Sequence, residues 1–292
     1  MGSRARIAAV GEICEDVFLD AEGVTKAQTL GGISCNFARS AAWAGGESAL
    51  FAAVGEDQSG ERVLNWLAEE RVVTFVRKLN GITPCQKVRI ETNGERRFVG
   101  FDPGVLFDYE LSDEELRAIN SYEVVALPCS PESHRVFDQI LTKKRSGASY
   151  AMVADFSPES LEGDGALLAR YDEVASDLAI AFVGGDSSYI EPLRERSRQV
   201  ETVTVLTLGA LGAIAFHRGN TWREAAVSTK VVDTTGCGDA FAGAFVARYF
   251  EAYEPESDLP LRIQNALKQA AMCAALVASK LGGGPGFRGN LL

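Results

Sequence analysis

The stretch Val231–Phe250, VVDTTGCGDAFAGAFVARYF, decides how the rest of this chain is interpreted. Two β-branched residues lead into Asp233-Thr234-Thr235, and Gly236-Cys237-Gly238-Asp239 then precedes a long run of small and apolar residues. Glycine accepts positive φ and lets the backbone approach a ligand closely. The stretch therefore predicts a glycine turn that opens onto a buried helix.

The start of that helix is a predicted anion site. Its first N–H groups lack partners within the helix and lie at the positive end of the helix dipole, so the turn favours anionic oxygens such as those of phosphate. Asp239 is a carboxylate placed where an anion would bind. Two interpretations are open at this point: Asp239 caps the helix, or it takes a proton from a hydroxyl that attacks a phosphate.

The composition is that of a globular chain without a broad basic surface. The 292 residues are 46% hydrophobic and 24% charged, with a net charge of -11, which argues against nucleic acid or an anionic membrane as a partner. No apolar segment reaches the length of a membrane span, and the six scattered cysteines follow no metal-ligand spacing. We expect a cytoplasmic protein with reduced thiols, no nucleic-acid partner and no membrane contact.

The N-terminal part of the chain predicts a strand, a glycine pair and a hairpin. A strand over residues 6–10 ends at Gly11, and Gly31-Gly32 precedes Asn36 and an Ala-rich helix over 37–44. Asn36 can offer both a donor and an acceptor to a hydroxylated ligand, or it can simply cap the helix. Asn-Gly at 93–94 predicts a tight hairpin, whose Lys- and Arg-rich strands over 86–91 and 96–100 would suit a flap over a site.

From residue 111 onward the pattern alternates between strands and helices. Strands are predicted over 123–127, 150–155, 178–183, 202–208 and 213–217, and helices over 131–146, 161–171, 189–199 and 261–281. This alternation is typical of βαβ units on a parallel sheet covered on both faces. Ligands of such folds lie beyond the carboxyl ends of the strands, where the strand over 150–155 ends in a carboxylate.

Two other nucleotide-binding patterns are excluded. A formal GxGxxG occurs at Gly284, Gly286 and Gly289, but it follows a helix instead of a strand, so an NAD-dependent dehydrogenase is rejected. The chain has no Gly-Lys dipeptide and hence no P-loop.

Taken together, the motifs resemble those of the ribokinase-like (PfkB) carbohydrate kinases. Asp233–Asp239 is similar to the family's DTxGxGD signature, with Cys237 where alanine is usual. Gly31-Gly32 with Asn36 and Ala38 resembles the family's first motif, Gly11 to Asp16 its substrate-binding strand, and Thr207 to Gly212 its nucleotide loop. Within the family, the segments 55–73 and 97–109 and the short length look most like fructoselysine 6-kinases, which phosphorylate sugar–amine adducts.

The resemblance implies an architecture. The chain 1–292 would form one ribokinase-like α/β domain, a doubly wound, mostly parallel sheet flanked by helices. A small β-lid would be built from about residues 12–32 and 84–101. Lids of this family often pair between subunits, so a homodimer through the lid is expected.

The resemblance also implies roles for individual residues. Asp239 would be the general base for a sugar hydroxyl, beside an anion hole formed by the N–H groups of Gly236, Cys237 and Gly238. The implied substrate ligands are Asp16, Gly31, Gly32, Asn36 and, from the lid, Arg97. Thr207, Gly209 and Gly212 would line ATP, and Asp233 and Thr235 could belong to a loop for a monovalent cation such as K⁺.

One departure concerns Mg²⁺. The family's Asn-x-x-Glu motif is not evident after residue 183, where the chain reads Gly184-Gly185-Asp186-Ser187-Ser188. Either Asp186 or Glu191 replaces the usual glutamate, or ATP phosphates and water hold the Mg²⁺.

Other functions stay open on the same fold. They are phosphorylation of a nucleoside or of another ketose, and non-catalytic binding of a sugar or nucleotide. The lack of an aromatic clamp near Asp16 argues against a nucleoside, and the intact Asp239 argues against a sensor. Cys237 raises a separate question: at a helix N-terminus its thiol could have a lowered pKa and react readily, or it could merely replace alanine.

Overall fold

A nine-stranded sheet forms the centre of the protein. The computed structural model describes residues 4–90, 96–156, 165–251 and 258–285, and the sheet is built within them. In sheet order its strands are β13 (Asn220–Glu224), β12 (Ala213–His217), β11 (Val203–Thr207), β10 (Ile180–Gly184), β9 (Ala151–Phe156), β8 (Val124–Pro128), β1 (Arg6–Gly11), β4 (Glu47–Gly55) and β5 (Val73–Leu79). Neighbouring strands from β11 to β5 are parallel, and β12 is antiparallel to both of its neighbours.

Helices cover both faces of this sheet, as the alternation of strands and helices predicts. On β1, Ile7 and Ala9 pack into one hydrophobic cluster, whereas Ala8 and Val10 pack into the other. The first cluster includes residues of α1 (Ile33–Trp43), α2 (Gln58–Leu67), α7 (Cys237–Tyr249) and α8 (Leu259–Ala278). The second includes residues of α3 (Asp113–Ile119), α4 (His134–Arg145), α5 (Ala166–Val174) and α6 (Ile190–Arg196). The predicted doubly wound α/β fold is thus confirmed.

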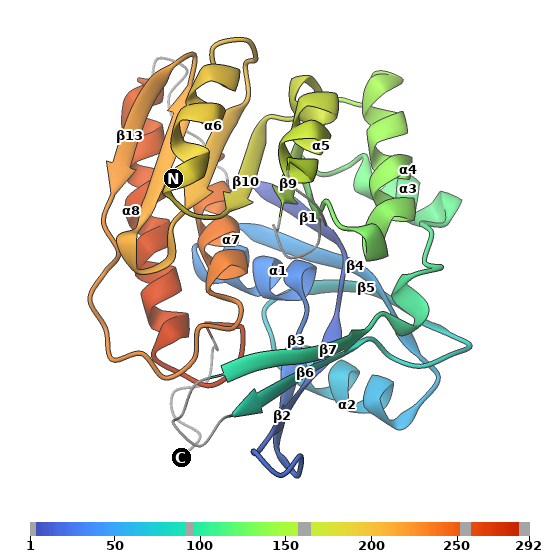
Figure 1. Cartoon of the computed structure of the whole chain (residues 1–292). Coiled ribbons are helices and arrows are strands. Elements are labelled where there is room, and N and C mark those ends of the chain that lie inside the picture. The colour runs from blue at the N-terminus through green and yellow to red at the C-terminus, as the bar shows by residue number, and fades with distance from the viewer. Residues whose placement is uncertain (1–3, 91–95, 157–164, 252–257, 286–292) are drawn as a thin grey trace.

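A second, four-stranded sheet lies across one end of the first (Figure 1). Its order is β3 (Thr25–Gly31), β2 (Cys14–Leu19), β6 (Cys85–Ile90) and β7 (Arg96–Asp102), with β2 and β6 parallel and the outer pairs antiparallel. We call this sheet the lid. Its strands match the two segments for which the sequence predicts a lid, except that β7 extends one residue further, to Asp102. The predicted hairpin tip at 92–95 lies outside the described residues.

The differences from the sequence prediction are clearest at α1 and β13, and the start of the helix predicted over 161–171 lies outside the described residues. Helix α1 begins at Ile33, four residues before the predicted start, because Gly32 is its N-cap. Strand β13 was not predicted, since its polar residues alternate between exposed and half-buried positions at the edge of the sheet. Positive φ at Arg218 and Gly219 closes the β12–β13 hairpin, which is typical of two-residue hairpin loops.

Among the described helices, none is both long and apolar enough to cross a membrane.

Candidate active site

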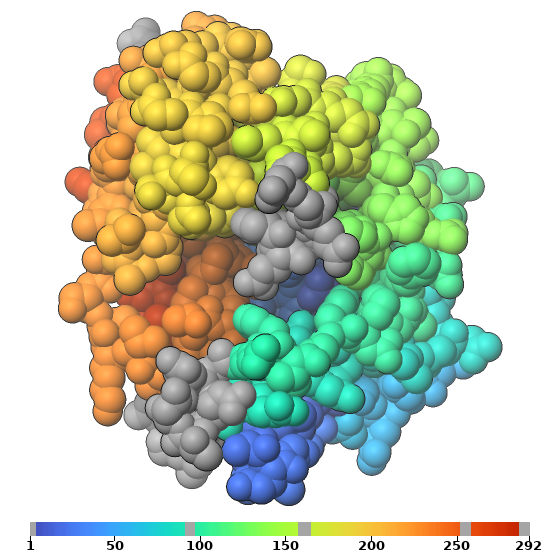
Figure 2. Space-filling view, in the orientation of Figure 1, coloured from blue at the N-terminus to red at the C-terminus, as the bar shows by residue number. Residues whose placement is uncertain are grey.

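A cavity of about 530 Å³ opens between the lid and the carboxyl ends of the large sheet. Figure 2 shows the surface hollowed there, between residues of β7 and those at the start of α7. The carboxyl ends of β8, β9, β10 and β11 contribute Pro128, Asp155, Gly184 and Thr207. This edge is where open α/β sheets bind ligands.

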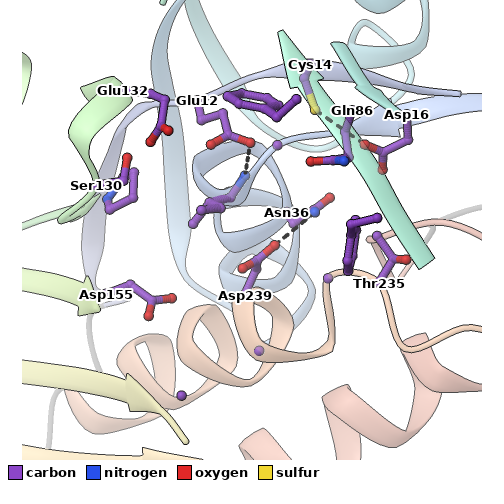
Figure 3. Close-up of a pocket in the computed structure, with 18 of the residues that line it drawn as sticks. Glu12, Cys14, Asp16, Asn36, Gln86, Ser130, Glu132, Asp155, Thr235 and Asp239 are labelled. Carbon is purple, nitrogen blue, oxygen red and sulfur yellow. Dashed lines mark hydrogen bonds between the residues drawn. The ribbon is translucent and has the colours of Figure 1, made fainter. Parts of the chain in front are cut away.

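The cavity brings together most of the site residues predicted from the sequence. The predicted residues that line it are Asp16, Gly32, Asn36, Thr207, Thr235, Gly236, Gly238 and Asp239. The predicted residues outside its lining are Gly31, Arg97, Gly209, Gly212, Asp233 and Cys237. Asn36 and Asp239 are far apart in the sequence, yet the Asn36 Nδ2 donates a hydrogen bond of 3.0 Å to the Asp239 Oδ2 (Figure 3).

Asp239 lies in the first turn of α7 and faces the cavity. Burial raises the pKa of its carboxyl from 3.8 to about 6, against the opposing effect of the hydrogen bond from Asn36. A carboxylate with a pKa near 6 can accept a proton at neutral pH and holds it more strongly than an ordinary aspartate. This is the property expected of a general base.

Asn36 is itself held by a chain of polar contacts. The Arg39 Nη1 lies 3.5 Å from the Asn36 Oδ1, and the Arg39 Nη2 forms an ion pair of 2.6 Å with the Glu70 Oε1. Arg39 and Glu70 side chains are only 10% and 11% exposed. This arrangement leaves the Asn36 amide N–H₂ directed at Asp239.

Asp16 is a buried carboxylate beside the glycine pair. The Cys14 thiol donates to its Oδ1 at 3.3 Å, and its Oδ2 accepts no hydrogen bond from the described residues. Burial raises its pKa to about 7. A Cβ on Gly31 would lie 2.3 Å from this carboxyl group, so the glycine leaves the space that the Asp16 side chain occupies. The partly unsatisfied carboxylate fits a role in binding a ligand hydroxyl.

Three further carboxylates line the cavity and were not assigned to the site from the sequence. Glu12, Glu132 and Asp155 face the same space as Asp239 (Figure 3). Burial raises the pKa of Glu12 to about 8 and that of Asp155 to about 7, and Asp239 adds to both shifts. Glu12 and Asp155 lie at the carboxyl ends of β1 and β9. That position was the signal that could have identified them.

The lid contributes aromatic and polar groups. Gln86 of β6 and Phe98, Gly100 and Phe101 of β7 line the cavity. Arg97 is exposed and opposite Arg89 in the lid sheet, so a substrate role for Arg97 stays a prediction. The aromatic pair was missed because the sequence does not show which face of a lid strand turns inward.

Asp233 fastens the glycine turn to the end of α8. It is 1% exposed, its Oδ1 accepts the Thr235 N–H at 3.0 Å, and its Oδ2 accepts the Gly282 N–H at 2.9 Å. Its predicted part in a monovalent-cation loop stays a prediction. Gly209 and Gly212 lie in the turn between β11 and β12, and their predicted contact with ATP also stays a prediction.

For Cys237 the possibility of a lowered pKa is wrong. Burial, followed by the nearby Asp233 and Asp239, raises the pKa of its thiol to about 12. The Sγ lies 3.7 Å from the carbonyl oxygen of Ala274, on the α8 side. The Cys237 N–H donates to the Thr234 carbonyl oxygen at 3.2 Å, so the predicted anion hole depends mainly on the N–H groups of Gly236 and Gly238.

Replacing Cys237 with alanine is therefore expected to leave kcat/KM within about twofold of the wild type, because the thiol is protonated at neutral pH and faces away from the cavity. Steady-state kinetics and mass-spectrometric measurement of iodoacetamide labelling at pH 7 would check this. The expectation would be overturned if Cys237 were labelled rapidly, if the labelling abolished activity, and if ATP prevented the labelling.

A scan of the described residues finds no group of three or more His, Cys, Asp or Glu side chains arranged to hold a metal ion. Asp186 is exposed, and its Oδ1 accepts the backbone N–H of Ser188 at 2.8 Å.

Comparison with known proteins places the chain in a family. The model of the pfkB family carbohydrate kinases matches residues 4–287. Fructoselysine 6-kinase of Escherichia coli (strain K12) is 25% identical over 274 residues, which cover 92% of this chain and 95% of that protein.

Solved structures show the same fold. An adenosine kinase from Sinorhizobium meliloti superposes with a TM-score of 0.78 at 19% identity, over 97% of this chain and 96% of its own. A fructokinase double mutant from Vibrio cholerae O395 is described in a fructose-, ADP- and potassium-bound form. It superposes with a TM-score of 0.76 at 21% identity, over 97% of this chain and 95% of its own. The chain belongs to the PfkB family of carbohydrate kinases and has the ribokinase-like fold.

Proposed function

We propose that this PfkB family kinase transfers the γ-phosphoryl group of ATP to a hydroxyl of a sugar that carries an amine, with Asp239 as the general base. The observation that carries the proposal is the pairing of the Asn36 amide with the Asp239 carboxylate at the mouth of the glycine turn. In this mechanism the substrate hydroxyl gives its proton to Asp239 as its oxygen bonds to the γ-phosphorus. The bond between that phosphorus and the bridging oxygen of ADP breaks at the same time.

The rest of the turn would bind the transferring group. Gly236 and Gly238 line the cavity together with Asp239, and their N–H groups would stabilise developing negative charge without reorganisation. Asp16 and Asn36 would hold the sugar hydroxyls. Thr207, at the carboxyl end of β11, would lie alongside ATP together with Gly209 and Gly212.

The metal ions would come with the nucleotide. Mg²⁺ commonly keeps several waters and binds substrate phosphates with one or two carboxylates, and the acidic cavity supplies carboxylates of that kind. In the reaction Mg²⁺ would neutralise charge on the β- and γ-phosphates. A K⁺ ion near Asp233 and Thr235 is proposed by analogy with the potassium-bound fructokinase.

The acidity of the cavity supports an amine on the substrate. Five carboxylates (Glu12, Asp16, Glu132, Asp155 and Asp239) line it, and no Lys or Arg among the described residues does so. Burial, with a further contribution from the charge of Asp239, raises the pKa values of Glu12, Asp16 and Asp155. A protonated amine would favour the ionised forms, as an opposite charge does. The 25% identity to fructoselysine 6-kinase agrees with this substrate class.

A substrate panel would test the proposal. ATP consumption should be fastest with a fructosyl-amine such as fructoselysine, and slower with fructose, ribose and adenosine. Adenosine belongs in the panel because Phe98 and Phe101 line the cavity and could stack on a base, which favours the nucleoside alternative. A preference for adenosine would establish that alternative, and no turnover of any hydroxylated compound would favour a binding protein.

The variants Glu12→Gln and Glu132→Gln should lower kcat/KM more for a fructosyl-amine than for fructose. Each removes a carboxyl group whose ionised form the protonated amine would favour, and a hydrogen bond to a charged group contributes about 1.5–3 kcal/mol, or roughly 10–100-fold. We expect kcat/KM to fall by about that factor for the fructosyl-amine and to change little for fructose. An equal loss for both substrates would show that the carboxylates do not recognise an amine.

The activity should also depend on the protonation of Asp239. Since this carboxyl has a raised pKa of about 6 and must be ionised to accept a proton, kcat should fall as the pH drops through about 6. Removing the Asn36 donor in Asn36→Ala takes away a contact that lowers the pKa, so the acidic limb of the pH–rate profile should move to higher pH. A limb that stays in place would contradict the role of Asn36.

The lid is the proposed dimer interface. Val24, Phe98 and Val99 expose 56%, 52% and 37% of their surface there, and a second lid could cover part of this apolar area.

A further inference from the structure

A second cavity lies at the other end of the central strands. It has a volume of about 520 Å³ and is formed where β1, β4 and β5 begin and where α1 ends. The residues of this cavity that carry the inference are Arg4, Arg6, Trp43, Ser48, Arg71 and Tyr122. Arg6, at the start of β1, lines the second cavity, and Glu12, directly after the end of β1, lines the first.

The second cavity is basic. Three arginines and a single carboxylate, Glu47, line it, although the chain as a whole carries a net charge of -11. Within the described part of the chain, neither Arg4 nor Arg6 forms an ion pair. The Arg6 guanidinium lies 5.6 Å from the centre of the Tyr122 ring. The local charge therefore favours an anion.

A residue that lines the same site carries a buried hydroxyl without a partner. Ser48 is 4% exposed, and its Oγ makes no hydrogen bond to any described residue. A buried polar group that lacks a partner costs about 1–3 kcal/mol, and a ligand oxygen would supply the missing bond. Trp43 and Tyr122 add aromatic surface to the wall, so an anion with a flat apolar part fits better than a bare ion.

Adjacency in the sequence, followed by a chain of contacts, connects this cavity with Asp239. Arg71 directly follows Glu70, whose Oε1 lies 2.6 Å from the Arg39 Nη2. Arg39 contacts Asn36, and Asn36 donates to Asp239. Helix α1 also runs from Asn36 at the first cavity to Trp43 at the second.

We propose that the second cavity binds a small organic phosphate, and that binding changes the rate of the kinase through Glu70, Arg39 and Asn36. Guanidinium groups bind phosphate oxygens in pairs with defined geometry, and those of Arg4 and Arg6 together suit a dianion better than a monoanion. The effect on the rate rests on the proposed function, whereas binding itself does not.

Binding is tested without catalysis. Phenyl phosphate, inorganic phosphate and benzoate would be titrated into the full-length protein by calorimetry and by tryptophan fluorescence. We expect saturable binding, with the lowest Kd for phenyl phosphate.

The variants then test the lining residues. Arg4→Ala/Arg6→Ala should raise the Kd of phenyl phosphate at least about tenfold, and Ser48→Ala should raise it severalfold. Trp43→Phe should remove the fluorescence change. Arg117→Ala/Arg218→Ala, which removes two exposed arginines elsewhere, should leave the Kd unchanged.

Two results would overturn the site: no saturable binding of phenyl phosphate, or the same Kd in Arg4→Ala/Arg6→Ala as in the wild type. The coupling is tested by the ATP-dependent rate, which should change along the same saturation curve in the wild type and not in Arg4→Ala/Arg6→Ala. Binding that leaves the rate unaltered would refute the coupling. A protein with no kinase activity would refute the proposed function and leave the binding result standing.

Discussion

Replacing Asp239 with asparagine is expected to lower kcat by about 10²–10⁴-fold, the range that general-base catalysis contributes. Asparagine keeps the shape of the side chain and can still accept the hydrogen bond from Asn36, but it cannot take the hydroxyl proton. Steady-state kinetics with the best substrate of the panel would measure the loss. ATP affinity should change little, because the N–H groups of the turn remain.

The same variant should be as stable as the wild type or more stable. The difference between the ordinary pKa of 3.8 and the raised value of about 6 corresponds to roughly 3 kcal/mol of destabilisation at pH 7. A group with a raised folded-state pKa stabilises the fold when protonated and loses that contribution as the pH rises through 6. Asp108→Asn, at an exposed aspartate, is the matched control and should alter neither kcat nor Tm. Loss of both activity and stability in Asp239→Asn would indicate a structural role.

Gly236→Ala should have the second-largest effect. Gly236 has φ of +72°, and a Cβ there would lie 2.4 Å from the Cα of Gly283 and 2.6 Å from its carbonyl oxygen. The left-handed conformation costs a non-glycine residue about 1–2 kcal/mol, and overpacking costs about 1–3 kcal/mol more. Thermal unfolding should show a Tm lower by roughly 3–8 °C, and activity should fall because the turn beside Asp239 must shift.

Gly238→Ala, two residues further on, is the matched control. A Cβ at Gly238 would meet no protein atom within 4 Å, and its φ is not positive. Alanine is favoured over glycine within a helix by about 1 kcal/mol, so Tm should stay the same or rise. An equal fall in Tm for both variants would contradict the assigned geometry of the turn.

The sequence predicted the fold and the centre of the site because both depend on local patterns. The alternation of strands and helices fixed the layers, and glycines near Asn36 and Asp239 marked two helix starts that meet in the structure. Strand β13 was not predicted because an edge strand of polar residues has no buried face and therefore shows no apolar alternation in the sequence.

The rest of the site depends on long-range geometry. Glu12, Glu132 and Asp155 come together only because β1, β8 and β9 are neighbours in the sheet. The side of the lid on which Phe98 and Arg97 lie depends on the register between β6 and β7, and a bulge near Val88 alters that register. For Cys237, the position at a helix start suggested a reactive thiol with a lowered pKa. Burial against α8 and two nearby carboxylates raise that pKa instead.

The most direct test of the central claim is single-turnover phosphoryl transfer from ATP, because it isolates the chemical step from product release. It would be measured between pH 5 and 8 with the enzyme in excess over the sugar-amine. The wild-type rate should rise with pH, reach half of its maximum near the Asp239 pKa of about 6, and level off roughly one pH unit higher. In Asp239→Asn the rate should be about 10²–10⁴-fold lower and independent of pH. An Asp239→Asn rate close to that of the wild type, with the same pH dependence, would contradict the assignment of Asp239 as the base.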